Sequence, residues 1–256
     1  MTMNKPILLL LVSTLAIVLV VGAVSGCTMS GSTEINTSTS FGTGTSTPTS
    51  TPAPTAQGTT ETVVTGAPTV TTTGDKVTIT GSQDGTVDPK LESGGYIVEI
   101  LYKDEVEVDA GNYFVQATEN MFPARPDGWH LSITPADIQG GNPIKIKASN
   151  PYVVTFTKLP LAATPDTTPK TYKGTGSSVV GPITLNQGTV TLKGVSGKVK
   201  AQLYDATTGI FVTFDRSLYE DMDTPAEVTE DVLQDGSYLI QVIDDKYSDW
   251  EFTVSQ

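Results

Sequence analysis

Hydrophobic and polar residues alternate in short segments along the chain from about residue 70 onward. Alternation with a period of two residues predicts β-strands that bury one face. Val, Ile and Thr dominate these segments, as a pleated and half-buried surface favours. Gly, Asp, Asn and Pro separate them, and we expect turns at residues 82–85, 109–112, 205–209 and 234–236. The pattern predicts an all-β fold of antiparallel sandwiches or jelly-roll-like barrels.

Two short segments have the pattern of a helix start. Thr224-Pro225-Ala226-Glu227 has the arrangement of a capping box with Pro at the first helical position, and Thr134-Pro135-Ala136-Asp137 is a weaker version of it. We expect one or two helical turns at most from either segment.

Four sequence blocks occur twice in the same order. Residues 70–81 align with 183–194, 95–100 with 209–214, 111–117 with 236–242, and 129–134 with 250–255. Gly-x-Tyr and a following Trp recur together, which predicts a duplicated domain with altered loops. Strands at 144–148 and 152–156 have no counterpart in this alignment, and we expect them to close the first sheet or to bridge the halves.

The alternation also assigns faces to the last block of each half. Successive side chains of a strand point to opposite faces. We therefore predict that Trp129 and Trp250 fill the two cores, while His130 faces solvent. Tyr113 and Tyr238 are expected opposite these Trp residues, with their hydroxyls near the rim.

The beginning of the chain has another pattern. Lys5 precedes an apolar run over residues 7–24, and the run ends on Val24-Ser25-Gly26-Cys27. A charged start, an apolar run and small residues are typical of an export signal. A helix of about 18 residues is also barely long enough to span a bilayer, so an uncleaved anchor helix stays open. Both alternatives place the rest of the chain at the extracytoplasmic face of a cell membrane.

The segment Val24-Ser25-Gly26-Cys27 resembles the lipobox of bacterial and archaeal lipoproteins. The resemblance implies that the sulfur of Cys27 carries a lipid and that Cys27 is the mature N-terminus. Cys27 is the only cysteine of the chain, so no disulfide can form within one molecule.

Residues 28–73 are rich in Ser and Thr, with several Pro and few large apolar side chains. Such a segment buries too little surface to offset its conformational entropy, so we expect a disordered, mucin-like stalk. Asn36-Thr37-Ser38 is an N-glycosylation sequon within it. The predicted organisation is a signal or anchor at 1–27, the stalk at 28–73, β-sandwich domains at 74–160 and 181–256, and a linker at 161–180.

The formal net charge of the 256 residues is -13. An acidic surface repels phosphate backbones and anionic lipid head groups, which excludes nucleic acid as an expected partner. With one His and one Cys, a zinc site of the usual kind cannot be assembled. A catalytic triad would need His130, which lacks the accompanying Gly-rich elbow. The sequence therefore predicts no catalytic residue.

Acidic residues before Trp250 are the one candidate for a metal. Asp244, Asp245 and Asp249 could hold calcium through carboxylates and carbonyls, and otherwise they are solvated turn residues. No other cofactor is expected.

The tandem part resembles β-sandwich repeats of exported archaeal and bacterial proteins. Together with the anchor and the stalk, the resemblance favours a cell-surface protein with two non-catalytic modules. Their ligand would be a carbohydrate, an envelope protein or another copy of the chain, bound by loops or edge strands. The alternative is an exported carbohydrate-active enzyme that uses a carboxylate pair.

Overall fold

The computed structural model describes residues 66–217, 219–221 and 224–256, all within one compact unit, Thr51–Gln256. These residues form strands, turns and loops, and no helix is found among them. The prediction of an all-β fold is therefore confirmed for the described part. The apolar run at 7–24, Cys27 and Asn36 lie outside the described residues.

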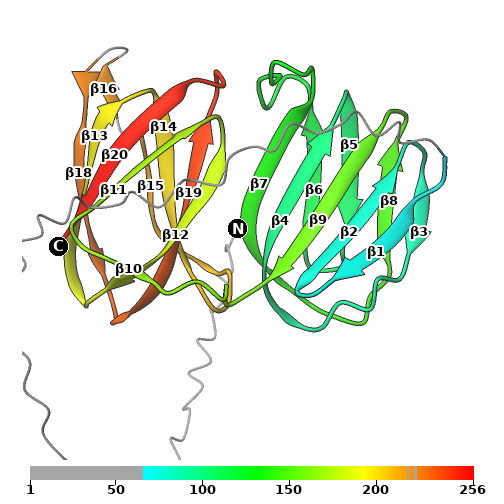
Figure 1. Ribbon diagram of the computed structural model, residues 1–256, viewed down its shortest axis with the longest axis horizontal. Coiled ribbons are helices and arrows are strands. Elements are labelled where there is room, and N and C mark those ends of the chain that lie inside the picture. The colour runs from blue at the N-terminus through cyan, green and yellow to red at the C-terminus, as the bar shows by residue number, and fades with distance from the viewer. Residues whose placement is uncertain (1–65, 218, 222–223) are drawn as a thin grey trace, which may run out of the picture. The chain divides into compact units, whose positions relative to one another are not determined.

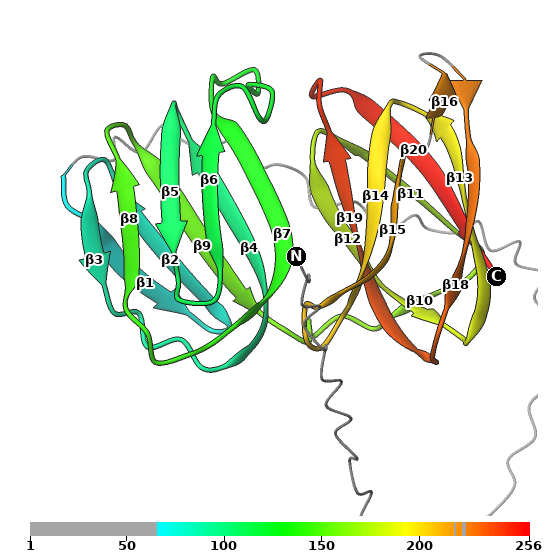
Figure 2. The same cartoon turned by 180° about the vertical axis from the view of Figure 1, so that it is seen from behind.

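The first nine strands form two sheets that lie face to face (Figures 1 and 2). The orders are β1-β2-β9-β4-β7 and β3-β8-β5-β6. The bounds are β1 Thr69–Thr73, β2 Lys76–Gly81, β3 Gly85–Val87, β4 Gly94–Tyr102, β5 Glu105–Asp109, β6 Phe114–Thr118, β7 His130–Ile138, β8 Ile144–Ala148 and β9 Tyr152–Lys158. Inward side chains such as Val98, Val108 and Phe156 form a core between the two sheets.

The remaining strands form a second pair of sheets, β10-β12-β19-β14-β15 and β11-β20-β13-β18, and a short β16-β17 ribbon. The bounds are β10 Asp166–Thr167, β11 Lys170–Thr175, β12 Ser178–Leu185, β13 Gly188–Ser196, β14 Val199–Asp205, β15 Phe211–Ser217, β16 Tyr219–Asp221, β17 Thr224–Pro225, β18 Glu227–Val232, β19 Gly236–Asp244 and β20 Asp249–Ser255. A separate core includes Leu192, Ile240 and Phe252. The β10–β12 pair is parallel, which departs from the antiparallel prediction.

Both pairs of sheets share one strand order. When β2 to β9 are numbered from one to eight, their sheets read 1-8-3-6 and 2-7-4-5. When β11 to β15 and β18 to β20 are numbered in the same way, their sheets also read 1-8-3-6 and 2-7-4-5. This interleaving of eight strands is the jelly-roll arrangement. β1 and β10 are additions to this arrangement. β1 lies beside β2, the first strand of its order, and β10 lies beside β12, the second strand of its order.

The aligned sequence blocks do not occupy equivalent strands in this order. The block at 111–117 lies at β6, the fifth strand, whereas its predicted match at 236–242 lies in β19, the seventh. Residues 129–134 and 250–255 lie in the sixth and eighth strands. β8 and β9, which the alignment left without counterparts, correspond to β19 and β20. The predicted alignment is wrong because β-strands share an alternation that fits in several registers.

An aromatic residue faces a glycine at the same place in both strand orders. Gly81 of β2 is the register partner of Tyr152 of β9, and Gly174 of β11 is the partner of Trp250 of β20. A Cβ on either glycine would overlap the aromatic side chain opposite it. These pairs join the first and eighth strands in each case, so they support the topological equivalence independently.

Two predicted boundaries need correction. The stalk was predicted to extend to residue 73, but Thr69–Thr73 is β1 and pairs with β2. The linker was predicted over 161–180, but this range contains β10, β11 and the start of β12. β11 pairs along its length with β20, so the hydrogen bonds of the sheet order this segment.

Neither predicted helix start opens a helix. Thr134 to Asp137 lie within β7, and Thr224–Pro225 is β17. β7 pairs with β4 along its length, and this strand pairing overrides the local preference for a helix start. Two predicted turns do follow their residue types, because Gly111 and Gly209 adopt positive φ after the side-chain caps of Asp109 and Asp205.

β19 is buried on both faces. Tyr238 and Ile240 point into the second core, whereas Leu239 packs with Leu159 and other residues of a small third cluster. The Nε2–H of Gln241 donates to the carbonyl of Ile133 in β7 at 2.6 Å. Apolar packing and this hydrogen bond therefore connect β19 with residues of the first pair of sheets.

Candidate binding face

The sheet β3-β8-β5-β6 has one apolar and one polar face because its strands alternate strictly. Ile144, Ile146 and Ala148 of β8 are buried, while the two Lys between them are exposed. β5 follows the same rule with Val106 and Val108 inward. The outward side chains form what we call the ladder face: Glu105, Glu107, Asp109, Gln116, Lys145 and Lys147.

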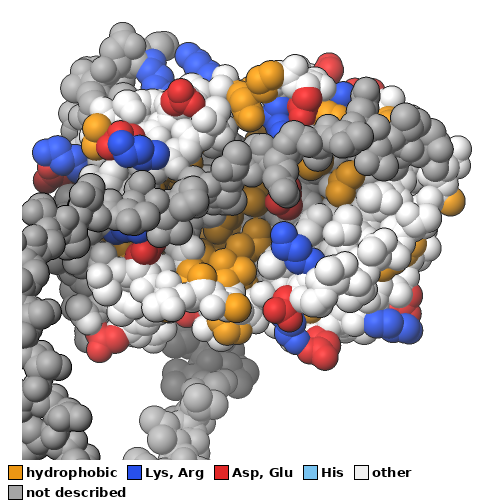
Figure 3. Space-filling model, in the orientation of Figure 1, with side chains coloured by type: hydrophobic (Ala, Val, Ile, Leu, Met, Phe, Trp, Pro, Cys, Tyr) orange, Lys and Arg blue, Asp and Glu red, His pale blue; other side chains and the backbone are white. Residues whose placement is uncertain are grey.

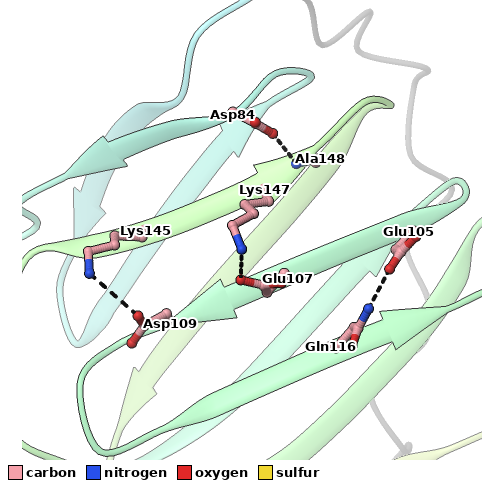
Figure 4. Close-up of polar contacts among 8 residues, drawn as sticks. All are labelled: Asp84, Glu105, Glu107, Asp109, Gln116, Lys145, Lys147 and Ala148. Atoms are coloured by element: carbon pink, nitrogen blue, oxygen red, sulfur yellow. Dashed lines mark hydrogen bonds and ion pairs between the residues drawn. The ribbon is translucent and has the colours of Figure 1, made fainter.

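Cross-strand contacts organise the ladder face (Figure 4). Lys147 Nζ lies 2.5 Å from Glu107 Oε1, and these residues are register partners. Lys145 Nζ lies 3.7 Å from Asp109 Oδ2, one step further along the same strands. Opposite charges on facing positions stabilise a strand pair. The ion pairs therefore arise directly from the register of β5 and β8.

The third contact is between β5 and β6. Gln116 Nε2 donates to Glu105 Oε1 at 2.6 Å. A contact between a side chain and the backbone lies beside these pairs. Asp84 Oδ1 accepts a hydrogen bond from the backbone N–H of Ala148 at 2.8 Å (Figure 4). Each carboxylate drawn on this face thus has a nitrogen partner, and the side chains are held in defined positions.

The electrostatic consequence is clearest at Lys147. Its hydrogen bond to Glu107 and the negative charge of that carboxylate raise the pKa of Lys147 above the ordinary lysine value. The ammonium of Lys147 therefore stays charged at neutral pH, since a raised pKa favours the protonated form. The face therefore presents charged donors and acceptors that neutralise one another locally.

Phe114 adds an exposed aromatic ring to this polar face. The residue is 59% exposed and is the register partner of Asp109, on the same side of the sheet as Gln116. A ring beside hydrogen-bonding groups can pack on an apolar surface of a ligand while its neighbours bind hydroxyl groups. The arrangement suits a flat polyhydroxylated ligand.

A concavity with mostly apolar walls offers less chemistry. Figure 3 shows hydrophobic side chains gathered near the middle of one face of the molecule. A cavity of about 210 Å³ is lined by Pro160, Leu161, Ala163, Pro165, Pro182, Ala206, Thr207, Ser237 and Leu239. Only Thr207 and Ser237 bring polar side chains to this cavity, so no constellation of reactive groups converges there.

Glu99 is a half-buried carboxyl that was not among the predicted site residues. It lies on β4 between the core residues Val98 and Ile100, with its side chain on the opposite side of the sheet. Burial raises the pKa of Glu99, and the positive charges of Lys76 and Arg125 oppose this shift without cancelling it. A carboxyl with a raised pKa is a candidate general acid.

Trp129 and His130 point in the directions opposite to those predicted. His130 is buried at 8% exposure, donates its Nδ1–H to the Phe122 carbonyl at 2.7 Å, and stacks on Tyr102. Trp129 precedes β7 and is half-buried, with Lys103 Nζ 4.8 Å from its ring centroid. The prediction failed because both faces of β7 have packing partners, so polarity does not identify the inward side.

The other predicted aromatic residues differ in their surroundings. Trp250 and Tyr238 are 2% and 0% exposed in the second core. Tyr238 donates its hydroxyl to the Gln234 carbonyl at 2.7 Å. Tyr113 packs against the first core, but its hydroxyl is buried without a hydrogen-bond partner and is not at the rim. This burial raises the pKa of Tyr113.

Asp244, Asp245 and Asp249 do not converge on one point. The carboxylate of Asp244 is fully buried and accepts the backbone amides of Lys246 and Ser248. Asp249 accepts a hydrogen bond from Thr175 Oγ1 at 2.5 Å, and Asp245 is exposed. Among the described residues, no three His, Cys, Asp or Glu side chains are grouped to hold a metal ion. Asp244 acts in this structure as the cap of its own turn.

The residues of the ladder face were not among the predicted site residues, although two segments of the sequence carry its charges. Glu105-Val-Glu-Val-Asp109 and Lys145-Ile-Lys147 are alternating segments of opposite charge. Their pairing was hidden because about 40 residues separate them and nothing local specifies which strands become neighbours. No helix long and apolar enough to cross a bilayer occurs within the described ranges.

Comparisons with known proteins give no family. No protein-family description and no curated protein matches the chain. Among solved structures, an archaeal virus protein described by a triple jelly-roll fold and turret assembly is 11% identical, with a TM-score of 0.22 over 70% of this chain and 57% of that one. A β-porphyranase of glycoside hydrolase family 86 from Bacteroides plebeius is 10% identical, with a TM-score of 0.19 over 74% and 36%.

The major capsid protein of bacteriophage PM2 is 9% identical to this chain, with a TM-score of 0.20 over 74% of this chain and 93% of that one. The matched part of this chain thus spans less than two thirds of the first two structures, at 57% and 36%.

Proposed function

We propose that this chain is a cell-surface protein that displays two tandem, non-catalytic jelly-roll modules, and that the ladder face binds carbohydrate. The observation that carries the proposal is the ordered row of Glu107–Lys147 and Asp109–Lys145 pairs beside the exposed ring of Phe114. Sugar hydroxyls both donate and accept hydrogen bonds, so a face that fixes both kinds of partner suits them.

The same contacts favour binding over catalysis. Hydrolysis of a glycosidic bond uses two carboxyl groups, one of which is protonated near neutral pH. On the ladder face Glu107 and Asp109 each form an ion pair with a lysine. The described carboxyl with a raised pKa, Glu99, lies on β4 in the other sheet of the pair.

Binding is tested with the full chain in detergent micelles, probed against immobilised polysaccharides. The variant Glu107→Ala/Lys147→Ala is compared with Glu251→Ala/Lys173→Ala, which removes a cross-strand ion pair of 3.0 Å in the second pair of sheets. The two pairs are matched in exposure, with side-chain values of 24% and 68% against 26% and 69%.

We expect the ladder variant to lose at least about tenfold in affinity, or about 1.4 kcal/mol, and the matched control to lose much less. Phe114→Ala should weaken binding in the same direction. Equal affinity of both double variants, or a wild-type protein that retains no polysaccharide, would reject the ladder face as a carbohydrate site.

Membrane attachment is a separate part of the proposal and rests on Lys5, the apolar run at 7–24 and Cys27. Mass spectrometry of the mature N-terminus is the direct test. A chain that begins at a lipidated Cys27 supports a lipoprotein, and an intact chain that extracts only with detergent supports an anchor helix. A chain released into the medium without lipid would contradict attachment.

The exported carbohydrate-active enzyme is the second candidate, and the raised pKa of Glu99 is the observation that favours it. The test is release of reducing sugar from polysaccharides by wild type, Glu99→Gln and the control Glu251→Gln. Turnover that disappears in Glu99→Gln and persists in the control would establish the enzyme and overturn the non-catalytic proposal.

A further inference from the structure

β1 is a strand without a buried face. All five of its residues, Thr69–Thr73, are exposed, and Val70 is 39% exposed. One edge of β1 pairs with β2 in a regular antiparallel register, and among the described residues the other edge ends the sheet. Alternate residues of such an edge strand present unpaired backbone N–H and C=O groups.

The other edges are shorter, charged or partly buried. β18 carries Glu227, Glu230 and Asp231, β11 carries two Lys, and β7 contains Pro135. β3 has three residues, and β6 buries Ala117. Charges, Pro and shortness are the usual means by which proteins prevent edge-to-edge pairing. Among the edge strands whose side chains the structure describes, β1 alone is exposed at every residue and lacks these protections.

β1 also lies outside the strands that the fold requires. The jelly-roll order of the first pair of sheets is complete with β2 to β9, and β1 is added beside β2. No residue of β1 belongs to a core cluster, and side-chain contact to β2 includes the hydrogen bond between the hydroxyls of Thr69 and Thr80 at 2.9 Å. Core burial therefore does not account for this strand.

We propose that β1 pairs antiparallel with β1 of a second copy of this chain, across a two-fold axis at Thr71. In this register Thr71 faces itself, Val70 faces Thr72, and Thr69 faces Thr73. A two-fold interface of this kind is isologous, because the same surface serves both copies. The pairing joins the two five-stranded sheets into one continuous sheet.

A second copy can approach at this edge without local charge repulsion. The chain has a formal net charge of -13, so copies repel each other wherever acidic side chains would meet. Residues 69–73 carry no charge, and the proposed register sets only Thr and Val side chains opposite one another. Thr and Val also favour strand pairing through cross-strand contacts of β-branched side chains.

The interface is short, so the dimer forms weakly in dilute solution and responds to local concentration. Attachment of copies to a common membrane would raise that concentration. The pairing itself does not depend on the carbohydrate proposal, since β1 and the ladder face belong to different sheets.

Cysteine cross-linking tests the register in full-length protein that carries Cys27→Ser, so that each introduced thiol is the only one. Directly opposed residues of antiparallel strands have Cβ atoms about 4.5–5.5 Å apart, within the range of a disulfide after small adjustments. We expect Thr71→Cys to form homodimers and Val70→Cys to cross-link to Thr72→Cys in a mixture, each at least about tenfold faster than the control Thr86→Cys, on the exposed part of β3.

Sedimentation measures the same interaction without introduced cysteines. The wild-type chain should shift toward a dimer as its concentration rises, and Thr71→Lys should stay monomeric with unchanged far-UV circular dichroism, because two ammonium groups would meet on the axis. Cross-linking of Thr71→Cys no faster than that of Thr86→Cys, or a wild type that stays monomeric at every concentration, would overturn the proposal. If β1 instead pairs with a strand of another protein, the wild-type chain alone would stay monomeric.

Discussion

The indole Nε1–H of Trp250 donates a hydrogen bond to the carbonyl oxygen of Gly176 at 2.7 Å. Gly176 lies two residues after Gly174, the residue that faces the indole across β11 and β20. In the first pair of sheets, the hydroxyl of Tyr152 donates to the carbonyl of Gln83, two residues after Gly81, at 3.2 Å. The same local arrangement thus occurs at the same place in both jelly rolls with different aromatic residues.

This arrangement predicts that glycine is required at positions 81 and 174. A Cβ at Gly174 would overlap the indole of Trp250, and a Cβ at Gly81 would lie 2.5 Å from Tyr152 Oη. We expect Gly174→Ala and Gly81→Ala each to lower the free energy of unfolding by about 1–3 kcal/mol, the usual cost of overpacking. Urea denaturation measures the change.

A double-mutant cycle separates overpacking from other effects of the added methyl group. In a Trp250→Leu background the ring is absent, so Gly174→Ala should cost less than it does in the wild type. An equal cost in both backgrounds would show that the indole is not the cause.

The buried tyrosines predict loss of stability at alkaline pH. Burial raises the pKa of Tyr152 to about 12, compared with an ordinary value of 10.0. A group with a raised folded-state pKa contributes stability below its unfolded pKa and loses it as the pH rises, here between pH 10 and 12. Tyr152→Phe should therefore reduce the fall in melting temperature over this interval.

Tyr102 provides an internal comparison for that experiment, because burial also raises its pKa to about 12. Tyr102→Phe and Tyr152→Phe combined should reduce the alkaline decline more than either change alone. If the decline is identical in all variants, deprotonation of these residues does not cause it.

The raised pKa of Glu99 predicts that this residue contributes more to stability at low pH than at high pH, whereas a salt-bridged acid contributes more at high pH. Its pKa is raised by burial, so the folded state prefers the protonated form and gains stability below the unfolded pKa. That contribution is lost as the pH rises through the folded pKa. Glu99→Gln, which is neutral at all pH values, should therefore raise the melting temperature at pH 7 relative to wild type, and the gain should disappear near pH 4.

Lys76 and Arg125 are the positive groups that partly offset the burial of Glu99. In Lys76→Met, the benefit of Glu99→Gln at pH 7 should increase. A benefit that is equal at pH 4 and pH 7 would contradict the assignment of the effect to ionisation of Glu99.

Asp244 predicts a destabilisation that is independent of calcium. Its carboxylate accepts the amides of Lys246 and Ser248, and its backbone N–H donates to Ser177 Oγ. Asp244→Ala leaves the partly buried amides of Lys246 and Ser248 without this acceptor and should cost about 1–3 kcal/mol. The same loss is expected in calcium and in chelator, whereas the exposed Asp245→Ala should have little effect. A wild type stabilised by calcium through Asp244 would instead support the metal site predicted from the sequence.

Alternation predicted the strands well because it is a local property. Val106 and Val108 of β5, and Ile144 and Ile146 of β8, show the inward and outward periodicity that the pattern requires. The charges of the ladder face follow the same alternation along β5 and β8. It did not give the neighbours, and the predicted alignment of the halves consequently matched strands with different places in the topology.

His130 shows where a local pattern stops being sufficient. Periodicity states that Trp129 and His130 point in opposite directions, and the structure agrees. Which direction is inward depends on β4, on Tyr102 stacked against the imidazole, and on the Phe122 carbonyl. A polar ring with a hydrogen-bond partner can be buried at little cost, so polarity alone gave the wrong side.

By itself the sequence determined the secondary structure class, the turns at Asp109 and Asp205, and the alternating charges of β5 and β8. These features depend on backbone preferences and on side-chain direction within a few residues. Only the tertiary structure decided that Glu107 meets Lys147, that Gly174 lies beneath Trp250, and that β1 ends a sheet. Such relationships join residues that are distant in sequence, and their physical basis is the pairing of strands around a common core, which no single segment specifies.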